Sequence, residues 1–365
     1  MGKITATAAG LLLSGAVVLA TPGSALSEPG TAGDGRRPAD QSLGSLAKRL
    51  DLRFATAVDM AALADDAAYR QKVASEFSGV TAENVMKWEV LEPQRGVYDW
   101  EQADRLVAFA RENRQTVRGH VLVWHNQLPA WLTEGNFSSQ ELRALLRRHI
   151  HETVRHFRGK VWHWDVVNEA FNEDGTLRDT IWLRNLGPGY IADAFRWAHE
   201  ADPRVRLYYN DYNIENVNAK SDAVYDLVRS LRAQGVPIHG VGVQGHHTVG
   251  SDLASMQRNL QRFDDLGVET SVTEADVRMV MPADATKLQA QANVYSTMLE
   301  SCLATPRCTS FTVWGFTDKY SWVPGWFDGE GAANILDENF QPKPAYHALR
   351  TDLALAGGPV AHRRP

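Results

Sequence analysis

The sequence has few cysteines, no excess of positive charge and no long run of apolar residues. Lys and Arg together number 38 against 44 Asp and Glu, which gives a net charge of −6 at pH 7. A nucleic-acid binder normally carries a basic excess that neutralises phosphates, so no nucleic-acid partner is expected. With 44% hydrophobic and 22% charged residues, the chain is also not a largely disordered protein.

The apolar run near the N-terminus is too short to cross a membrane. It covers residues 8–20, follows Lys3 and precedes the small residues 21–25, whereas a spanning helix needs about 20 apolar residues. This layout is typical of a secretory signal peptide over residues 1–25, with a membrane anchor as the weaker alternative. Residues 26–42 are rich in glycine, proline and charge and are predicted to form a flexible leader. We therefore expect a secreted protein that does not bind membranes.

The two cysteines, Cys302 and Cys308, lie close together in a chain that is expected to be exported. An oxidising compartment favours a disulfide between them. Closing so short a loop stabilises a fold by about 2 kcal/mol in the chain-entropy model. A metal or redox pair is the weaker interpretation, because the sequence has no Cys-x-x-Cys motif and no accompanying Cys/His spacing.

Short apolar or β-branched segments alternate with helical patterns along the rest of the chain, which predicts an α/β fold. Amphipathic helices include residues 103–113, 139–157 and 219–234. A (β/α)₈ TIM barrel fits this alternation, as a single domain over 43–354 with a tail at 355–365. A doubly wound sheet normally carries a glycine-rich phosphate loop, which the sequence lacks. The eight predicted strands are residues 53–58, 79–85, 116–124, 161–168, 206–210, 240–244, 269–273 and 310–315.

In such a barrel, the residues that act on a ligand lie at the carboxyl ends of the strands. Amides, carboxylates and tryptophans follow the predicted strands there, with little arginine. This combination suits a neutral sugar, because hydroxyl groups pair with amides and carboxylates while ring C–H groups pack on indole faces. Of the 11 tryptophans, Trp162, Trp164 and Trp197 are predicted to pack inside the fold. The tryptophans predicted to face a ligand are Trp124, Trp314 and Trp322.

Two glutamates end apolar strands, which is unfavourable strand chemistry unless each residue has a task. Glu169 follows Val166, Val167 and Asn168, and Glu274 follows Val272 and Thr273. Glycosidic cleavage needs one carboxylic acid that protonates the leaving oxygen and one carboxylate that attacks the anomeric carbon or activates water. The two carboxyl groups must therefore lie in different electrostatic environments.

Seven sequence runs, in order along the chain, resemble family 10 glycoside hydrolases, the retaining endo-1,4-β-xylanases. The resemblance covers residues 43–354, and the seven runs together are very specific. It implies a TIM barrel that hydrolyses internal β-1,4-xylosidic bonds of xylan by retaining double displacement. The runs are TAENVMKWE (81–89), RGHVLVWHNQLPAWL (118–132), WDVVNEA (164–170), YYNDYN (208–213), GVQGHH (242–247), VTEADV (272–277) and TVWGFTDKYSW (312–322).

The resemblance also implies roles for individual residues. Glu169 matches the acid/base of the family, and Glu274 matches its nucleophile. Asn168 resembles the amide that holds the 2-hydroxyl of the sugar at the cleavage site. His246 matches the histidine that bonds the nucleophile, with Asp276 behind it as its orienting partner. The sugar-binding matches are Tyr212 on the leaving-group side and, on the non-reducing side, Glu83, Asn84, Lys87, His120, Trp124, Gln127, Gln244, Trp314 and Trp322.

Two other functions compete with this interpretation. The 12 histidines suggest a metal-dependent barrel hydrolase, but His246 and His247 are adjacent and would point to opposite faces of a strand, so no metal site is predicted. A non-catalytic sugar-binding barrel would be expected to have lost one carboxylate, whereas Glu169 and Glu274 are both present. We expect no cofactor, and a monomer whose partners are β-1,4-xylan and xylo-oligosaccharides.

Overall fold

The computed structural model describes residues 41–358. The predicted signal peptide (1–25) lies outside the described residues, as do the predicted leader up to residue 40 and the predicted tail from residue 359. Among the described residues, no helix is long and apolar enough to cross a membrane.

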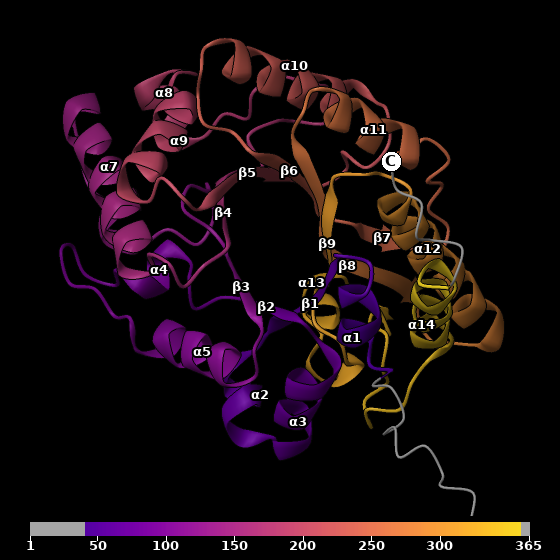
Figure 1. Cartoon of the computed structure of the whole chain (residues 1–365). Helices are drawn as coiled ribbons and strands as arrows, with labels where there is room; N and C mark the ends of the chain where they lie inside the picture. The colour runs from indigo at the N-terminus through magenta and orange to yellow at the C-terminus, as the bar shows by residue number, and fades with distance from the viewer. Residues whose placement is uncertain (1–40, 359–365) are drawn as a thin grey trace, which may run out of the picture. The chain divides into compact units, whose positions relative to one another are not determined.

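The centre of the fold is a closed barrel of eight parallel strands, each hydrogen-bonded to the next, with the last strand also paired to the first. Figure 1 shows the strands as a ring with helices around its outside. This arrangement confirms the predicted TIM barrel. The barrel strands are β1 (Arg53–Val58), β2 (Gly79–Ala82), β3 (Thr116–Gly119), β4 (His163–Asn168), β5 (Arg206–Asp211), β6 (Gly240–Val243), β8 (Glu269–Val280) and β9 (Cys308–Val313).

The barrel strands are buried over almost their whole length, as expected for parallel strands that are covered by helices on one side and packed with side chains on the other. Predicted and observed strands agree in number, but β2 and β3 end earlier than predicted. The residues that follow them, including His120 and Trp124, therefore lie in the loops after the strands.

Strand β8 is longer than predicted, because it continues past Thr273 through Val280. Two short strands hold this extension. Strand β7 (His246–Thr248) pairs in parallel with Asp276–Arg278, and β10 (Glu330–Gly331) pairs antiparallel with Val280 and Met279. Glu274 consequently lies inside a strand with neighbours on both sides, rather than at a free strand end.

Helices form the outer layer and bury an apolar stripe against the strands. The three predicted helices are confirmed as α5 (Glu101–Glu112), α7 (Ser139–His156) and α10 (Ala219–Ala233). Helix α7 begins with a capping box between Ser138 and Glu141. The other helices are α2 (Met60–Asp65), α3 (Ala67–Glu76), α4 (Trp88–Leu91), α6 (Ala130–Thr133), α8 (Ile181–Leu186), α9 (Tyr190–Ala201), α11 (Met256–Asp265), α12 (Ala285–Leu303), α13 (Val323–Trp326) and the 3₁₀ turn η1 (Asp318–Tyr320).

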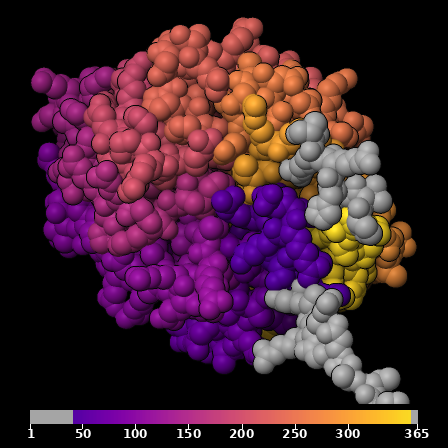
Figure 2. Space-filling model, viewed as in Figure 1, coloured from indigo at the N-terminus to yellow at the C-terminus, as the bar shows by residue number. Residues whose placement is uncertain are grey.

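Helices α1 (Leu43–Lys48) and α14 (Pro344–Ala356) bring the two ends of the described chain together. Figure 2 shows the indigo atoms of the first segments beside the yellow atoms of α14. Helix α1 packs against β1, α3 and α14. Helix α14 continues two residues past residue 354, the predicted end of the barrel.

The predicted disulfide is formed, with Cys302 and Cys308 joined by an S–S bond of 2.01 Å. It connects the end of α12 to the first residue of β9. Trp164 and Trp197 pack inside the fold as predicted. Trp162 is only half-buried, and the guanidinium of Arg53 lies 4.1 Å from its ring centre.

Candidate active site

A cleft of about 600 Å³ lies at the carboxyl ends of the barrel strands. The residues that the sequence assigned to catalysis and sugar binding come from seven barrel strands and the segments that follow them, yet all of them line this one cleft. The barrel brings them together because its parallel strands all end on the same face. These residues are Glu83, Asn84, Lys87, His120, Trp124, Gln127, Asn168, Glu169, Tyr212, Gln244, His246, Glu274, Trp314 and Trp322.

Glu274 is buried at the base of the cleft and accepts hydrogen bonds on both carboxylate oxygens. Its Oε1 accepts from Asn210 Nδ2 at 2.8 Å and from the Arg118 guanidinium at 3.0 Å. Its Oε2 lies 3.4 Å from His246 Nε2. Burial alone would raise the pKa of Glu274, but the interactions with His120, His246 and Arg118 outweigh it and lower this pKa well below the usual range. The carboxyl group is therefore anionic and suited to nucleophilic attack.

Asp276, two residues further along β8, orients the neighbours of Glu274. Its Oδ1 lies 2.9 Å from His246 Nδ1, and its Oδ2 accepts a hydrogen bond from Trp322 Nε1 at 2.7 Å. Burial opposes a charged imidazole, but Asp276 and Glu274 outweigh that effect and raise the pKa of His246 to about 10. Asp276 and Glu274 thus approach the two different ring nitrogens of His246.

Glu169 directly follows β4 and sits higher in the cleft. Its backbone has a φ of 56°, an uncommon value for a residue with a side chain. Its amide donates to Asn210 O at 2.9 Å, which ties this turn to β5. Its side chain accepts hydrogen bonds from Trp124 Nε1 at 2.9 Å and Gln244 Nε2 at 3.0 Å. These neutral donors contrast with the cations around Glu274.

A chain of amides links the two glutamates. Asn210 Nδ2 donates to Glu274 and also to Asn168 Oδ1, at 2.8 Å in both cases. Asn168 Nδ2 in turn lies 3.2 Å from Glu169 Oε1. Thr273 holds Asn210 from below by donating to its Oδ1 at 2.7 Å. Because each amide is fixed by its neighbour, the two carboxyl groups are held in a defined relation to each other.

On one side of the cleft, a polar set surrounds the Lys87 ammonium. Its Nζ donates to Asn84 Oδ1 at 3.0 Å and to Gln127 Oε1 at 2.6 Å, and Gln127 Nε2 donates to Glu89. Burial lowers the pKa of Lys87. Burial, reinforced by Asp59, raises the pKa of the neighbouring Glu83 to about 7. These groups offer both donors and acceptors to sugar hydroxyls.

On the other side, Tyr212 presents its ring to the cleft and is fixed from behind. The buried Lys220 ammonium lies 3.5 Å from the ring centre. The Tyr212 hydroxyl accepts a hydrogen bond from Arg178 at 2.8 Å. Arg178 also donates to the backbone oxygen of Glu169 at 3.0 Å, so it connects this wall to the turn that carries Glu169.

Several residues that shape the site have no predicted role. Asn210 belongs to the run YYNDYN, but the sequence does not indicate its position between the glutamates. Arg178 and the exposed Trp326 also line the cleft. Arg118 and Asp165 lie beneath it, inside the barrel. They could have been found as oppositely charged residues in the middle of adjacent strands that are otherwise uncharged and buried.

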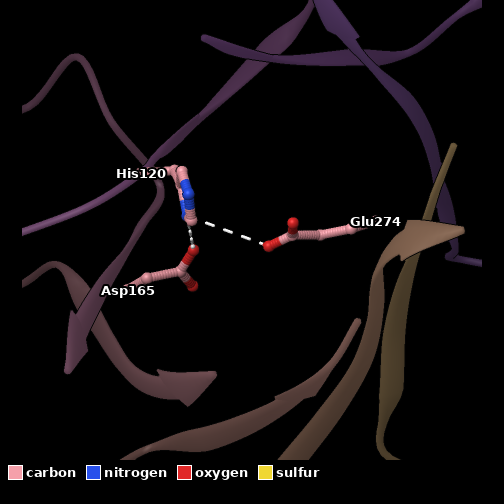
Figure 3. A group of neighbouring side chains, drawn as sticks. All are labelled: His120, Asp165 and Glu274. Carbon is pink, nitrogen blue, oxygen red and sulfur yellow. Dashed lines mark hydrogen bonds and ion pairs between the residues drawn. The ribbon is translucent and has the colours of Figure 1, made fainter. Parts of the chain in front are cut away.

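His120, Asp165 and Glu274 could in principle form a metal site, because one ligand atom from each lies within 4.8 Å of the others. Figure 3 shows the three side chains converging, with His120 directed toward both carboxylates. However, the Arg118 guanidinium donates to Asp165 at 2.5 Å and to Glu274 at 3.0 Å. A positive charge thus already occupies the position between the carboxylates, and the donor set does not fit a metal ion.

Comparison with known proteins extends these observations. The model of glycosyl hydrolase family 10 matches residues 42–352. An endo-1,4-beta-xylanase of Agaricus bisporus is 47% identical over 298 residues, which are 81% of this chain and 89% of that protein.

Two crystal structures have the same fold. Native xylanase 10B of Thermotoga maritima has a TM-score of 0.84 and 44% identity, covering 87% of this chain and 99% of that one. Xylanase 10B of Thermotoga petrophila RKU-1, in complex with xylobiose, has a TM-score of 0.85 and 43% identity, covering 87% and 98%. With a family match over nearly the whole described barrel and both glutamates in one cleft, the chain belongs to glycosyl hydrolase family 10.

Proposed function

We propose that the protein is an endo-1,4-β-xylanase that cleaves internal bonds of xylan with retention of configuration. The observation that carries this proposal is the unequal environment of two carboxyl groups in one cleft. Glu274 is surrounded by cationic donors, whereas Glu169 contacts an indole and two amides. The xylobiose complex of the Thermotoga petrophila relative supports a xylan-type substrate.

The proposed reaction has two steps. In the first, a Glu274 oxygen forms a bond to the anomeric carbon while the bond to the leaving oxygen breaks and Glu169 gives that oxygen its proton. In the second, Glu169 takes a proton from water as the water oxygen attacks the anomeric carbon and displaces Glu274. Configuration is inverted twice and therefore retained.

The cleft walls would position the sugar chain for these steps. Asn168 is placed to hold the 2-hydroxyl, because it lies between the two glutamates and its Oδ1 is fixed by Asn210. The indole rings of Trp124, Trp314 and Trp322 offer apolar faces for sugar rings on the non-reducing side. Tyr212 offers such a face on the leaving-group side.

The test is digestion of xylopentaose, with NMR of the first-formed anomer. We expect internal cleavage and β-configured products, and α-products would contradict the double displacement. Glu274→Ala is expected to abolish turnover and to be rescued by azide with an inverted, α-configured glycosyl azide as product. An unaffected rate in Glu274→Ala would overturn its assignment as nucleophile.

We also propose that the protein is exported and acts as a monomer. Export is supported by the signal-peptide pattern of residues 1–25 and by the disulfide, which is a bond of oxidising compartments. The test is N-terminal sequencing of protein recovered from the culture medium. A mature chain that begins near residue 26 is expected, and retention inside the cell would contradict the proposal. Size-exclusion chromatography with light scattering would test the monomer.

A further inference from the structure

We propose that Arg118 is a positioning residue of the reaction, which keeps Glu274 anionic and directs its Oε2 toward the sugar. The inference rests on the proposed function of Glu274. It adds a residue from inside the barrel that does not line the cleft.

Arg118 lies in β3 with its side chain directed into the barrel, where only 3% of it is exposed. The guanidinium makes three short contacts with distinct partners. It donates to Thr273 O at 2.7 Å, to Glu274 Oε1 at 3.0 Å and to Asp165 Oδ2 at 2.5 Å. One planar group thus holds both the backbone before Glu274 and the carboxylate itself, which a point-like ammonium could not do.

The contacts make the two oxygens of Glu274 unequal. Oε1 accepts from both Arg118 and Asn210, and these two donors fix it on the floor of the cleft. Oε2 has only the longer approach of His246, at 3.4 Å. The less engaged oxygen keeps more electron density for bond formation, so the geometry assigns the attack to Oε2.

Arg118 keeps its charge at every working pH, because an arginine does not lose its proton in proteins. His246, the other cation in contact with Glu274, loses its charge as pH rises through its pKa of about 10. Without Arg118, less positive charge would compensate the three buried carboxylates around His246, which belong to Glu274, Asp165 and Asp276. The titratable and charged groups that surround Glu274 are Arg118 from β3, His120 after β3, Asp165 from β4, Glu169 after β4, His246 from β7, Asp276 from β8 and Lys87 after β2.

Asp165 completes the arrangement as the counter-charge of Arg118. It is fully buried and also bonds His120 Nδ1 at 2.8 Å. Removing one member of a buried ion pair leaves the other uncompensated, which can prevent folding. The experiment therefore uses four variants: Arg118→Met, Arg118→Lys, Asp165→Asn and the double variant Arg118→Met/Asp165→Asn, in which both members of the pair are neutral.

The measurement is the pH dependence of covalent labelling by 2,4-dinitrophenyl 2-deoxy-2-fluoro-β-xylobioside, followed by mass spectrometry. Dinitrophenolate leaves without protonation, so the reaction depends on the ionisation of the nucleophile and not on Glu169. The acidic limb of the rate profile then reports Glu274 directly. If the wild-type protein is not labelled, that result contradicts the proposed function of Glu274 and not the role of Arg118.

We expect Arg118→Met to move the acidic limb upward by about one pH unit or more, because an opposite charge at this distance lowers the pKa of a carboxyl group by 1–3 units. Below the limb this is a loss of about ten-fold in labelling rate. Arg118→Lys keeps the charge and is expected to leave the limb near its wild-type position while lowering the rate. Asp165→Asn removes a negative charge and is expected to leave the limb unmoved or lower it.

A structural role for the ion pair would reduce folding and activity in all these variants without moving the limb. A folded Arg118→Met protein with an unmoved limb would therefore overturn the proposal, and so would an upward shift in Asp165→Asn. If Arg118→Met alone does not fold, the double variant is compared with Asp165→Asn, which also lacks the negative charge of Asp165. Its limb is expected to lie above that of Asp165→Asn, and equal limbs in these two variants would overturn the proposal. If that also fails to fold, Asp165→Asn and Arg118→Lys decide, since an upward shift in either contradicts the proposal.

Discussion

Replacing Asp276 by asparagine should greatly lower the pKa of His246 while leaving the shape of the site almost unchanged. Asparagine has the size of aspartate, and its oxygen can still accept from Trp322 or His246. What it removes is the negative charge 2.9 Å from His246 Nδ1. In the wild-type protein, burial lowers the pKa of His246, and Asp276 is the largest contribution that reverses this and raises it to about 10.

The size of the change follows from the distance. Two unit charges 2.9 Å apart interact by about 6 kcal/mol at an effective dielectric constant of ~20. Since one pKa unit corresponds to about 1.4 kcal/mol, this is an upper bound of about four units. Allowing for relaxation and solvent, we expect the pKa of His246 to fall by at least about two units, to below about 8.

The pKa of His246 can be measured by following the ¹⁵N and ring ¹H resonances of the histidines with pH. The His246 signal is identified by its absence in His246→Gln. It should titrate near pH 10 in the wild-type protein and below about 8 in Asp276→Asn. Asp328→Asn is the matched control, because Asp328 is an exposed aspartate in the segment after β9 that also carries Trp322. A His246 titration that is unchanged in Asp276→Asn would refute the electrostatic account of this contact.

The same perturbation has a consequence for stability. A histidine whose folded pKa lies above its unfolded value stabilises the fold fully below the unfolded pKa, near 6.5, and this contribution is lost as pH rises through the folded value. The wild-type melting temperature should therefore contain a component from His246 that declines between about pH 6.5 and 10. In Asp276→Asn that component should be smaller, which calorimetry over this pH range would detect.

Two predictions concern stability away from the cleft. Cys302→Ala/Cys308→Ala should lose about 2 kcal/mol of folding free energy, which lowers Tm by a few degrees. Reduction of the disulfide in the wild-type protein should lower Tm by the same amount. A variant with the Tm of the oxidised wild-type protein would contradict this entropic estimate. Lys343→Met should cost about 3 kcal/mol, because the buried Lys343 ammonium donates to the largely buried Asp318 and to two backbone oxygens. Denaturant unfolding would measure this loss, with the exposed Lys48→Met as control. A loss below about 1 kcal/mol would show that Asp318 finds another partner.

Much of the site was predictable because the barrel turns sequence order into spatial proximity. Once alternating strands and helices indicate parallel strands in a ring, every residue just past a strand belongs to one rim. Glu83, Glu169 and Tyr212 are far apart in the sequence and line one cleft for this reason. The exact partners were not predictable, because a single sequence does not tell which amide lies between two carboxylates.

The end of β8 was predicted too early for a related reason. Glu274 and Asp276 are poor strand residues by intrinsic preference, which suggests an end at Thr273. The strand continues because Ala275 pairs with Val313 of β9 and Asp276 pairs with His246 of β7. Pairing with neighbours on both sides overrides the local preference, and it places Glu274 on rigid backbone, where functional side chains are best held.

The charges inside the barrel point to the same principle. Arg118 and Asp165 occupy central positions of β3 and β4 and are buried. Removing two charges from water costs about as much free energy as their mutual attraction contributes, so apolar side chains at these positions would stabilise the fold at least as well. The presence of this buried ion pair is therefore not explained by the stability of the fold. It becomes understandable once Glu274 is included, because the guanidinium that neutralises Asp165 also holds the Glu274 carboxylate. Charged residues at buried strand positions are expected mainly at functional sites. The pair of Arg118 and Asp165 therefore extends the active site beneath the residues that line the cleft.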